Sequence, residues 1–473
     1  MPVFRTLAFI ATSCLLCSTP SHAQIERAGK IDATYQELCA SCHGPRMEGG
    51  QAPSMLDTAW VHGGDDQAIA SSIRNGYPDK GMPAWAGKLS DDQIRTMVIL
   101  IRERGDAYRR ASTPPAKPAE SMRVDSQLHS FTMKTWVADL QEPWSLAFLP
   151  GGLALTTEKS GALYVIENGK RRAAPVTGVP SVNNQQQAGL YDVVPHPQYA
   201  SNGWLYLAFA DPQTAADGSP VSLTRIVRGK LRGNALVEQQ TIYQAALTFY
   251  PKAGGVHYGG RIAFDRQGYL YFTIGERGTR TNAQDLSVPM GKVHRLFDDG
   301  RIPDDNPFAK DAKALPTIWS YGHRNPQGLA VEPMSGRLFD AEHGPRGGDE
   351  LNVVLPGRNY GWPAITYGME YDGSPITHIT RQEGMEQPIN YWVPSIGICG
   401  INFYVGELFP KWRNHLFVAS LAGQDVRRLE IVGDQVVSQE VLFANLGRVR
   451  HVIGGPDGAL YVLLPERIAR IAP

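Results

Sequence analysis

Two cysteines and a histidine stand together near the start of the chain, in the order Cys39-Ala40-Ser41-Cys42-His43. This C-x-x-C-H spacing is the attachment signature of a c-type haem. Thiols three positions apart lie on nearly one face of a helix, so each can form a thioether to a porphyrin vinyl group while His43 reaches the iron. The alternatives are a redox-active cysteine pair and half of a zinc site, and zinc would require two further ligands at suitable spacing.

A methionine follows at a distance that suits the opposite side of a haem. Met82 lies in the segment Gly-Met-Pro-Ala-Trp at 81–85, 39 residues after His43. A thioether ligand raises the potential of a haem, which suits an electron acceptor. Packing in a core is the alternative role for Met82.

Helices are expected on both sides of these ligands. The residues from 31 to 38 are compatible with a helix before the cysteines, and Ser90 to Gln93 form a capping box. After the box, apolar residues recur at the spacing of one helical face, at Ile94, Met97, Val98 and Ile101. With these helices around its ligands, the segment 27–108 resembles a small class I cytochrome c domain.

The segments on either side of this domain have simpler compositions. Residues 1–23 carry one early arginine, a short apolar stretch and a small-residue cleavage site, which predicts a secretory signal peptide and a periplasmic product. The apolar stretch is too short to span a bilayer, so we expect no stable membrane insertion. Residues 109–125 contain three prolines among small and charged residues, and predict a semi-extended linker between a domain at 24–108 and one at 126–473.

The overall composition excludes several classes of protein. The 473 residues include 46 Lys and Arg against 46 Asp and Glu, so the formal net charge is zero and gives no support for a nucleic-acid partner. Apolar residues make up 42% of the chain, which excludes a mainly disordered protein. The 49 glycines and 34 prolines favour many turns and short strands.

One phrase recurs six times after residue 126. Two or three apolar residues lead through a polar turn to a second apolar group, whose leucines stand at positions 153, 205, 270, 338, 416 and 460. Each phrase reads as two strands around a turn, and each interval has room for a four-stranded sheet. The irregular spacing of β-rich phrases predicts a six-bladed β-propeller, with a pair of β-sandwiches as the alternative.

Between the phrases lie polar, glycine-rich segments that could meet near the propeller axis. They contain a histidine, several arginines, carboxylates and Gly-Pro carbonyls, at 257–261, 275–278, 321–328, 342–350, 359–363 and 448–450. Arginine side chains suit a ligand with several carboxylates. Carboxylate and carbonyl oxygens suit a hard cation such as calcium.

These segments resemble the soluble pyrroloquinoline quinone (PQQ) sugar dehydrogenases, most closely their periplasmic aldose sugar dehydrogenase branch. The resemblance covers nearly all of 130–470 and includes the motifs at 291–296 and 302–308. It implies a six-bladed propeller that holds PQQ and calcium. The implied activity is oxidation of the anomeric carbon of an aldose to a lactone.

The resemblance also implies roles for individual residues. It places the catalytic base at His257, with Glu276 beside it and Gln187 near the substrate. It places PQQ against Arg324, Asn325, Arg448 and Arg450. It implies one calcium on the carbonyls of Gly344 and Pro345, and a second, structural calcium held by Glu350 and Tyr360.

Two positions depart from the pattern of that family. Glucose-oxidising members carry a lysine at the PQQ after a Ser-Leu pair, whereas here Ser420-Leu421 precedes Ala-Gly-Gln, and Gln424 is expected to replace the lysine in part. The family's aspartate beside the base is Glu276, one methylene longer.

The two domains together predict a quinohaemoprotein oxidoreductase. Electrons from PQQ would pass to the covalently bound haem c, and then to an external acceptor such as a soluble or membrane cytochrome or oxidase. Two alternatives remain open at this point. One is a non-enzymatic, haem-bearing propeller that binds a protein or glycan, and the other is a calcium-dependent propeller lactonase.

Overall fold

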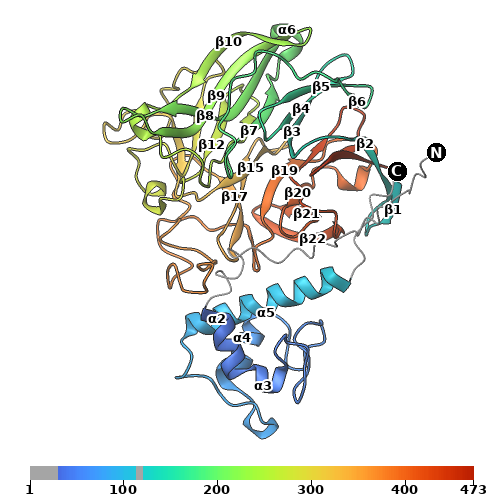
Figure 1. Ribbon diagram of the computed structural model, residues 1–473, viewed down its shortest axis with the longest axis vertical. Helices are drawn as coiled ribbons and strands as arrows, with labels where there is room; N and C mark the ends of the chain where they lie inside the picture. The colour runs from blue at the N-terminus through green and yellow to red at the C-terminus, as the bar shows by residue number, and fades with distance from the viewer. Residues whose placement is uncertain (1–29, 113–120) are drawn as a thin grey trace, which may run out of the picture.

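The computed structural model describes residues 30–112 and 121–473 (Figure 1). The expected signal peptide and the three prolines of the expected linker lie outside these residues. The described chain forms a small helical domain followed by a β-propeller, as the sequence predicts. None of the helices within the two described ranges is long and apolar enough to cross a membrane.

The helical domain is built around the expected haem ligands. Its α-helices are α2 (Lys30–Leu38), α3 (Ala40–His43), α4 (Asp66–Asn75) and α5 (Asp91–Ser112), with a 3-10 helix η1 (Pro78–Lys80). The capping box is confirmed, because the Gln93 amide donates to Ser90 Oγ (3.2 Å) and the Ser90 amide donates to Gln93 Oε1 (2.9 Å). The four apolar residues expected to face inward on α5 are all buried.

Helix α5 continues beyond the expected domain boundary at residue 108. It ends at Ser112. The reason lies in the sequence, because residues 109–112 contain no helix breaker and the first proline stands at 114. A proline disfavours the helical conformation of the residue before it, which here is residue 113. The last position free of this effect is Ser112, where α5 ends.

Six sheets make up the second domain, and their strands pair antiparallel throughout the described residues. The first three sheets contain β3 (Pro143–Phe148), β4 (Leu153–Glu158), β5 (Leu163–Glu167) and β6 (Lys170–Arg171); β7 (Leu190–Pro195), β8 (Trp204–Thr214), β9 (Pro220–Arg232) and β10 (Ala235–Tyr243); β11 (Ile262–Phe264), β12 (Leu270–Ile274), β13 (Lys292–Leu296) and β14 (Ile318–Tyr321). A short helix α6 (Tyr199–Asn202) joins β7 to β8.

The remaining three sheets contain β15 (Pro326–Val331), β16 (Leu338–Glu342), β17 (Asp349–Val354) and β18 (Asn390–Trp392); β19 (Ile398–Phe403), β20 (Leu416–Ser420), β21 (Val426–Val432) and β22 (Gln435–Phe443); β23 (His451–Gly454), β24 (Leu460–Leu464), β25 (Arg467–Ala472), β2 (Ser130–Val137) and β1 (Ser121–Asp125). The six phrases of the sequence coincide with the first two strands of each sheet. The predicted six-bladed propeller is therefore confirmed, and the alternative of two β-sandwiches is wrong.

The two ends of the propeller chain meet in the last sheet. Strand β2 pairs with β25, with Met133 opposite Ile471, so the first strands of the domain complete the last blade. Strand β1 occupies part of the segment expected to be linker. It pairs with β2, and Met122 and Val124 pack against the core, which explains why this stretch is a strand.

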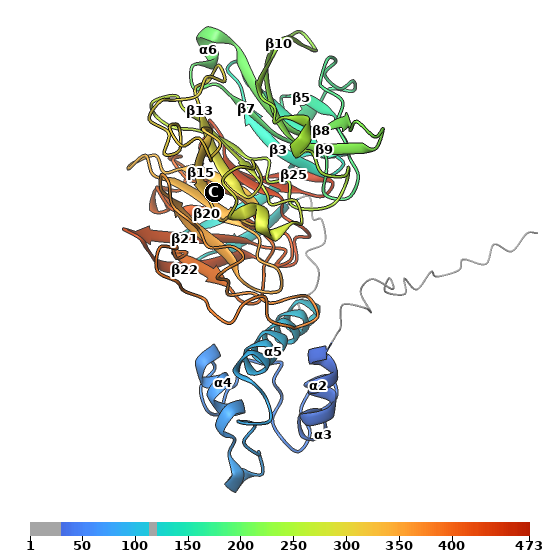
Figure 2. The same cartoon turned by 90° about the vertical axis from the view of Figure 1, so that its left-hand side faces the viewer.

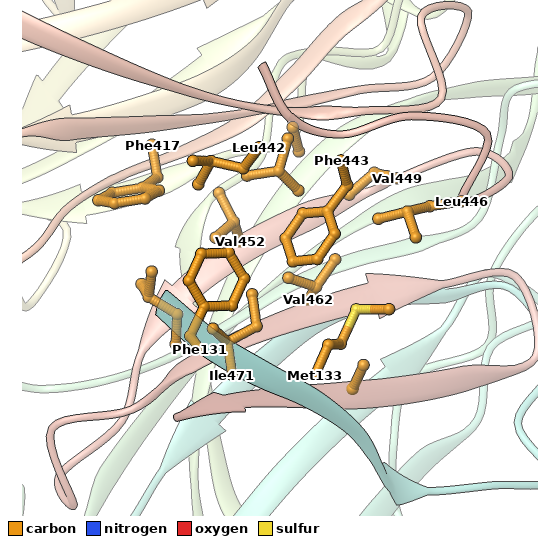
Figure 3. Packing of buried hydrophobic residues seen from close by; sticks show 14 of the residues in the cluster. Phe131, Met133, Phe417, Leu442, Phe443, Leu446, Val449, Val452, Val462 and Ile471 are labelled. Carbon is orange, nitrogen blue, oxygen red and sulfur yellow. The ribbon is translucent and has the colours of Figure 1, made fainter. Parts of the chain in front are cut away.

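A hydrophobic cluster closes the ring at this point (Figure 3). Phe131 of β2 packs among residues of the last two sheets, including Phe443 (ring centroids 5.4 Å apart) and Trp412 (5.3 Å). The burial of these aromatic side chains stabilises the contact between the last blades of the propeller. The loops at both ends of the propeller depend on this closure for their positions.

The helical domain packs against one end of the propeller. Figures 1 and 2 show α5 against the propeller, with α3 and α4 on its far side. Ile99 of α5 is only 1% exposed, and it lies close to Gly347 of the β16–β17 loop. Thr96 Oγ1 donates to the Gly373 carbonyl (3.0 Å), and Asp92 pairs with His378.

Candidate functional site

The expected haem ligands surround two adjoining cavities in the helical domain. The cavities measure about 280 and 370 Å³ and share His43 and Met82 in their linings, while Cys39 and Cys42 line the larger one. Ile101 of α5 lines both of them. The structure therefore brings all four predicted residues to one space.

The donor groups of this space fit a covalently attached haem. Cys39 and Cys42 are free thiols. His43 Nδ1 lies 3.3 Å from the Pro53 carbonyl, and donation along this contact leaves Nε2 available to iron. Burial lowers the pKa of His43, which favours the neutral imidazole that metals require.

The sequence assigns Met82 as the sixth ligand of the haem iron. Met55 lines the same two cavities and is therefore the competing candidate. We expect Met82→Leu to lower the midpoint potential of the haem by on the order of 0.1 V, a fraction of the ~0.8 V range that axial ligands span. The matched variant Met55→Leu should leave the potential nearly unchanged. Redox titration of the haem bands measures both, and a larger shift in the Met55 variant would contradict the assignment.

A third and larger cavity, of about 850 Å³, lies at the end of the propeller that faces α5, and we refer to it as the central cavity. Residues from all six sheets or their connections line it, and eight of the twelve predicted site residues of the propeller domain are among them. These are Gln187, His257, Arg324, Asn325, Gly344, Pro345, Arg448 and Arg450.

His257 lines this cavity, and hydrogen bonds hold both its backbone and its imidazole. Its backbone has a positive φ of 58°, its amide donates to Gln187 Oε1 (2.8 Å), and its Nδ1 contacts the Glu276 carboxylate. Donation from Nδ1 to Glu276 leaves Nε2 as the acceptor. Glu276 does not line the cavity itself, and it is only 1% exposed.

The environment of His257 sets the pH range in which it can accept a proton. Burial lowers its pKa, and the nearby Arg324 and Arg277 guanidinium groups add to this effect. The Glu276 carboxylate opposes both and raises the pKa.

Glycine is needed just before Glu276, because a side chain at Gly275 would stand 2.4 Å from the His257 carbonyl oxygen.

Five arginines line the cavity, and three of them, Arg324, Arg448 and Arg450, are the predicted ones. Burial lowers the pKa of Arg448, and the neighbouring Arg450 lowers it further. Arg324 Nη1 donates to the carbonyls of His343 and Gly344 (2.9 Å each), while its Nε has no hydrogen-bond partner in the described part of the chain. Arg324 is buried, whereas Arg450 is partly exposed and Arg448 is exposed, and all three line the same cavity. Guanidinium groups that share one cavity suit an anion with several carboxylates.

Asn325 serves the site indirectly as well as lining it. Its Oδ1 accepts from the Gly259 amide (3.1 Å) and so supports the loop that carries His257. The Gly344 carbonyl, an expected calcium ligand, already accepts from Arg324, so calcium there would use the second lone pair of that oxygen.

A buried acidic cluster lies beside this cavity and fits a second cation. His323, Asp340 and Glu342 bring ligand atoms within 4.8 Å of one another. Asp340 Oδ1 lacks a hydrogen-bond partner among the described residues, whereas Asp340 Oδ2 lies 3.2 Å from His323 Nδ1 and forms an ion pair with it. Glu350 stands directly opposite Glu342 in the pairing of β16 with β17. Burial and the Glu342 and Asp340 charges raise the pKa of Glu350 well above its usual range.

A small cavity of about 10 Å³, enough for one ion or water, joins this cluster to Tyr360. The Tyr360 hydroxyl is committed elsewhere, because it donates to the Val353 carbonyl (2.5 Å) and accepts from the Leu355 amide (2.8 Å). Tyr360 could therefore contribute only its main-chain carbonyl to a cation. The predicted pair Glu350 and Tyr360 is brought together, with two more carboxylates than expected.

The structure does not bring Gln424 to the central cavity. Leu421 and Ala422 line it, whereas Gln424 lies outside the lining, with a positive φ of 56°. Gln424 therefore does not replace the lysine expected there.

Several cavity residues were missed by the sequence reasoning. Trp144 at the start of β3 lies between Arg261 (3.9 Å from its ring centroid) and Arg450 (5.8 Å), and Lys159 brings a cation from the end of β4. Gln327 accepts from Arg450 Nη1 (3.1 Å). Gln327 could have been found, because it directly follows Arg324, Asn325 and a proline.

Comparisons with known proteins agree with both halves of this architecture. The family model described as Glucose / Sorbosone dehydrogenase matches residues 140–472. A second model, described as Cytochrome C oxidase, cbb3-type, subunit III, matches residues 26–101.

Individual relatives cover the propeller. Aldose sugar dehydrogenase YliI of Escherichia coli (strain K12) is 42% identical over 332 residues, which span 69% of this chain and 88% of that protein. The apo crystal structure of the soluble aldose sugar dehydrogenase from Escherichia coli superposes with a TM-score of 0.68 at 39% identity, over 72% of this chain and 99% of that one. The PQQ-bound aldose sugar dehydrogenase from Streptomyces coelicolor gives 0.58 at 28% identity, over 76% and 99%.

Proposed function

Because the chain belongs to the glucose/sorbosone dehydrogenase family, fused to a cytochrome c domain, we propose that it is a PQQ- and calcium-dependent aldose dehydrogenase that passes electrons to its own haem. The observation that carries the proposal is the convergence of the His257–Glu276 pair and three arginines on one cavity. A histidine base suits proton abstraction, and the arginines suit the carboxylates of PQQ.

The residues of the central cavity fit PQQ. Arg324, Arg448 and Arg450 offer positive charge for its carboxylates, and the unpartnered Arg324 Nε offers a buried donor. Trp144 forms part of the cavity wall beside Arg450, and its side chain is almost fully buried there. The cavity volume of about 850 Å³ lies within the usual range for small-molecule sites and leaves room for a sugar beside a cofactor.

The chain's own residues direct the reaction. His257 Nε2 accepts the proton of the C1 hydroxyl group of a cyclic aldose, and the Glu276 carboxylate stabilises the imidazolium that forms. Gln187 holds the backbone of His257 and so fixes the position of the imidazole. Bound PQQ supplies the acceptor for the hydride that leaves C1, and the sugar product is the lactone. Calcium on the Gly344 and Pro345 carbonyls would polarise the acceptor as a Lewis acid.

The position of α5 supports electron transfer between the two domains. Leu100 lines the central cavity, and the next residue, Ile101, lines both haem cavities. One helix therefore separates the two cofactor spaces. A haem that accepts single electrons can then reoxidise a two-electron centre and pass the electrons on to an external acceptor, which we propose to be a periplasmic or membrane cytochrome or oxidase.

A visible spectrum of the haem-loaded, oxidised protein tests the proposal directly. Addition of an aldose together with PQQ and calcium should produce the ferrous haem bands, and omission of PQQ or chelation of calcium should prevent them. Dye reduction without haem reduction would retain the dehydrogenase and reject the internal electron transfer. Silence with both acceptors across a panel of aldoses would reject the proposed activity in favour of a non-enzymatic binding module or a lactonase.

A further inference from the structure

The helical domain contributes side chains to the central cavity of the propeller. Asp32 of α2 and Leu100, Glu103, Arg104 and Ala107 of α5 all line it, together with His257 and the axial arginines. The propeller therefore does not form this cavity alone. Any substrate that reaches His257 must share the space with these residues of the haem domain.

Contacts between the domains hold these side chains over the cavity. Arg346 donates to both carboxylate oxygens of Glu103, from Nε to Oε1 (3.0 Å) and from Nη2 to Oε2 (2.6 Å). A bidentate pair of this kind fixes orientation as well as distance. Arg346 directly follows Gly344 and Pro345, so α5 is tied to the loop that also lines the cofactor side of the cavity.

Arg104 and Asp32 form an ion pair at the cavity wall. Arg104 Nη2 lies 2.7 Å from Asp32 Oδ1, and the side chains are 54% and 20% exposed. A guanidinium has five N–H donors and a carboxylate has about four acceptor sites, so the pair retains free capacity for both donation and acceptance. Sugar hydroxyl groups both donate and accept, which makes such a pair well suited to bind them.

We propose that Arg104 and Asp32 form a distal sugar subsite, so that the haem domain completes the substrate-binding site of the propeller. This inference rests on the proposed function. The charges suited to PQQ lie on the propeller side, and His257 takes the C1 proton there, whereas Arg104 and Asp32 lie on the helical side. The end of the sugar remote from C1 then meets the pair, and a second sugar unit extends the contact.

The full-length variants Arg104→Gln and Asp32→Asn test this subsite in the dye-linked assay. Loss of hydrogen bonds to a charged group should raise KM for a disaccharide about tenfold or more, while kcat changes little. The rise should be smaller for the corresponding monosaccharide. A merely structural role would not produce this dependence on sugar length.

Arg102→Gln is the matched control. Arg102 lies on the same helix and pairs with Asp66 inside the helical domain (2.7 Å), outside the lining of the cavity. We expect its KM values to match those of the unmodified chain. An equal rise in KM in the Arg102 variant would overturn the subsite, since it would reflect general loosening of α5.

Titration of the apoprotein with PQQ separates sugar binding from cofactor binding. A weaker PQQ affinity in Arg104→Gln with unchanged KM values would overturn the subsite and assign Arg104 to the cofactor. Unchanged KM in an active enzyme would overturn the subsite alone. Failure of the unmodified chain to oxidise any aldose would overturn the proposed function, and the subsite with it.

Discussion

Replacement of His257 by alanine should lower aldose oxidation by about 10²- to 10⁴-fold, the usual contribution of a positioned general base. The loss should appear in kcat with either the dye or the haem as acceptor, because proton removal from the sugar precedes both. Stopped-flow reduction of the haem and steady-state dye reduction measure it. The covalent haem lies in the other domain and should be retained.

The pH profile separates this role from a structural one. Because burial and nearby arginines lower the pKa of His257, the neutral base persists below the usual histidine range, and activity should fall only as the pH drops through this lowered pKa. Glu276 raises the pKa, so Glu276→Gln should move the acid limb to still lower pH and reduce the plateau rate, since the base becomes weaker. A shift to higher pH would contradict the pairing.

His196→Gln is a suitable control for the base. His196 is also buried, and burial also lowers its pKa. It does not line the central cavity, and it pairs instead with Asp298 (3.5 Å). Its replacement should leave the rate and the acid limb close to those of the unmodified enzyme. A loss as large as that of His257→Ala would assign the effect to folding.

Separation of the domains should uncouple the haem from sugar oxidation. Ile99→Arg places a charge in the contact between α5 and the β16–β17 loop, where Ile99 is 1% exposed. Burial of an unpaired charge costs several kcal/mol, so the docked population should fall roughly tenfold for each ~1.4 kcal/mol. Sugar-driven haem reduction should slow accordingly, while dye reduction at saturating sugar persists.

Ile99→Leu is the conservative counterpart and should retain haem reduction. Dithionite-reduced spectra of both variants check that the haem is bound, since Ile99 lies outside the linings of the haem cavities. Haem reduction at the unmodified rate in Ile99→Arg would exclude the docked arrangement as the route of the electrons. Loss of dye reduction as well would indicate damage to the propeller instead.

Local patterns in the sequence were sufficient for the fold, whereas the individual roles in the propeller site followed from the resemblance to a known family. The six phrases predict the blades because each contains two strands and a turn, and the turn depends on nearby residues. The Cys39–His43 motif predicts its own chemistry because the ligands are neighbours in the chain. The same holds for the capping box before α5, whose bonds join residues three positions apart.

Contacts between distant segments escaped this reasoning. Nothing local distinguishes Gln424, which lies outside the lining of the cavity, from Lys159, which is part of it. The sequence predicts a linker where the closing strand β1 forms. Its partner β2 and the core residues beneath it follow only from the closed ring of blades.

Helix α5 shows most clearly the difference between features that follow from local sequence and features that follow from tertiary contacts. Its inward face, from Ile94 to Ile101, follows from helical periodicity. Its second buried face, with Thr96 and Ile99, packs on the propeller. The only sign of this second face in the sequence is the unbroken apolar run at 97–101. The sequence by itself predicted the helical domain and the propeller, and it supplied the residues that we propose as cofactor ligands and catalytic base. Only the tertiary structure decided that the haem domain shares the sugar cavity, because that depends on surfaces that meet after each domain has folded.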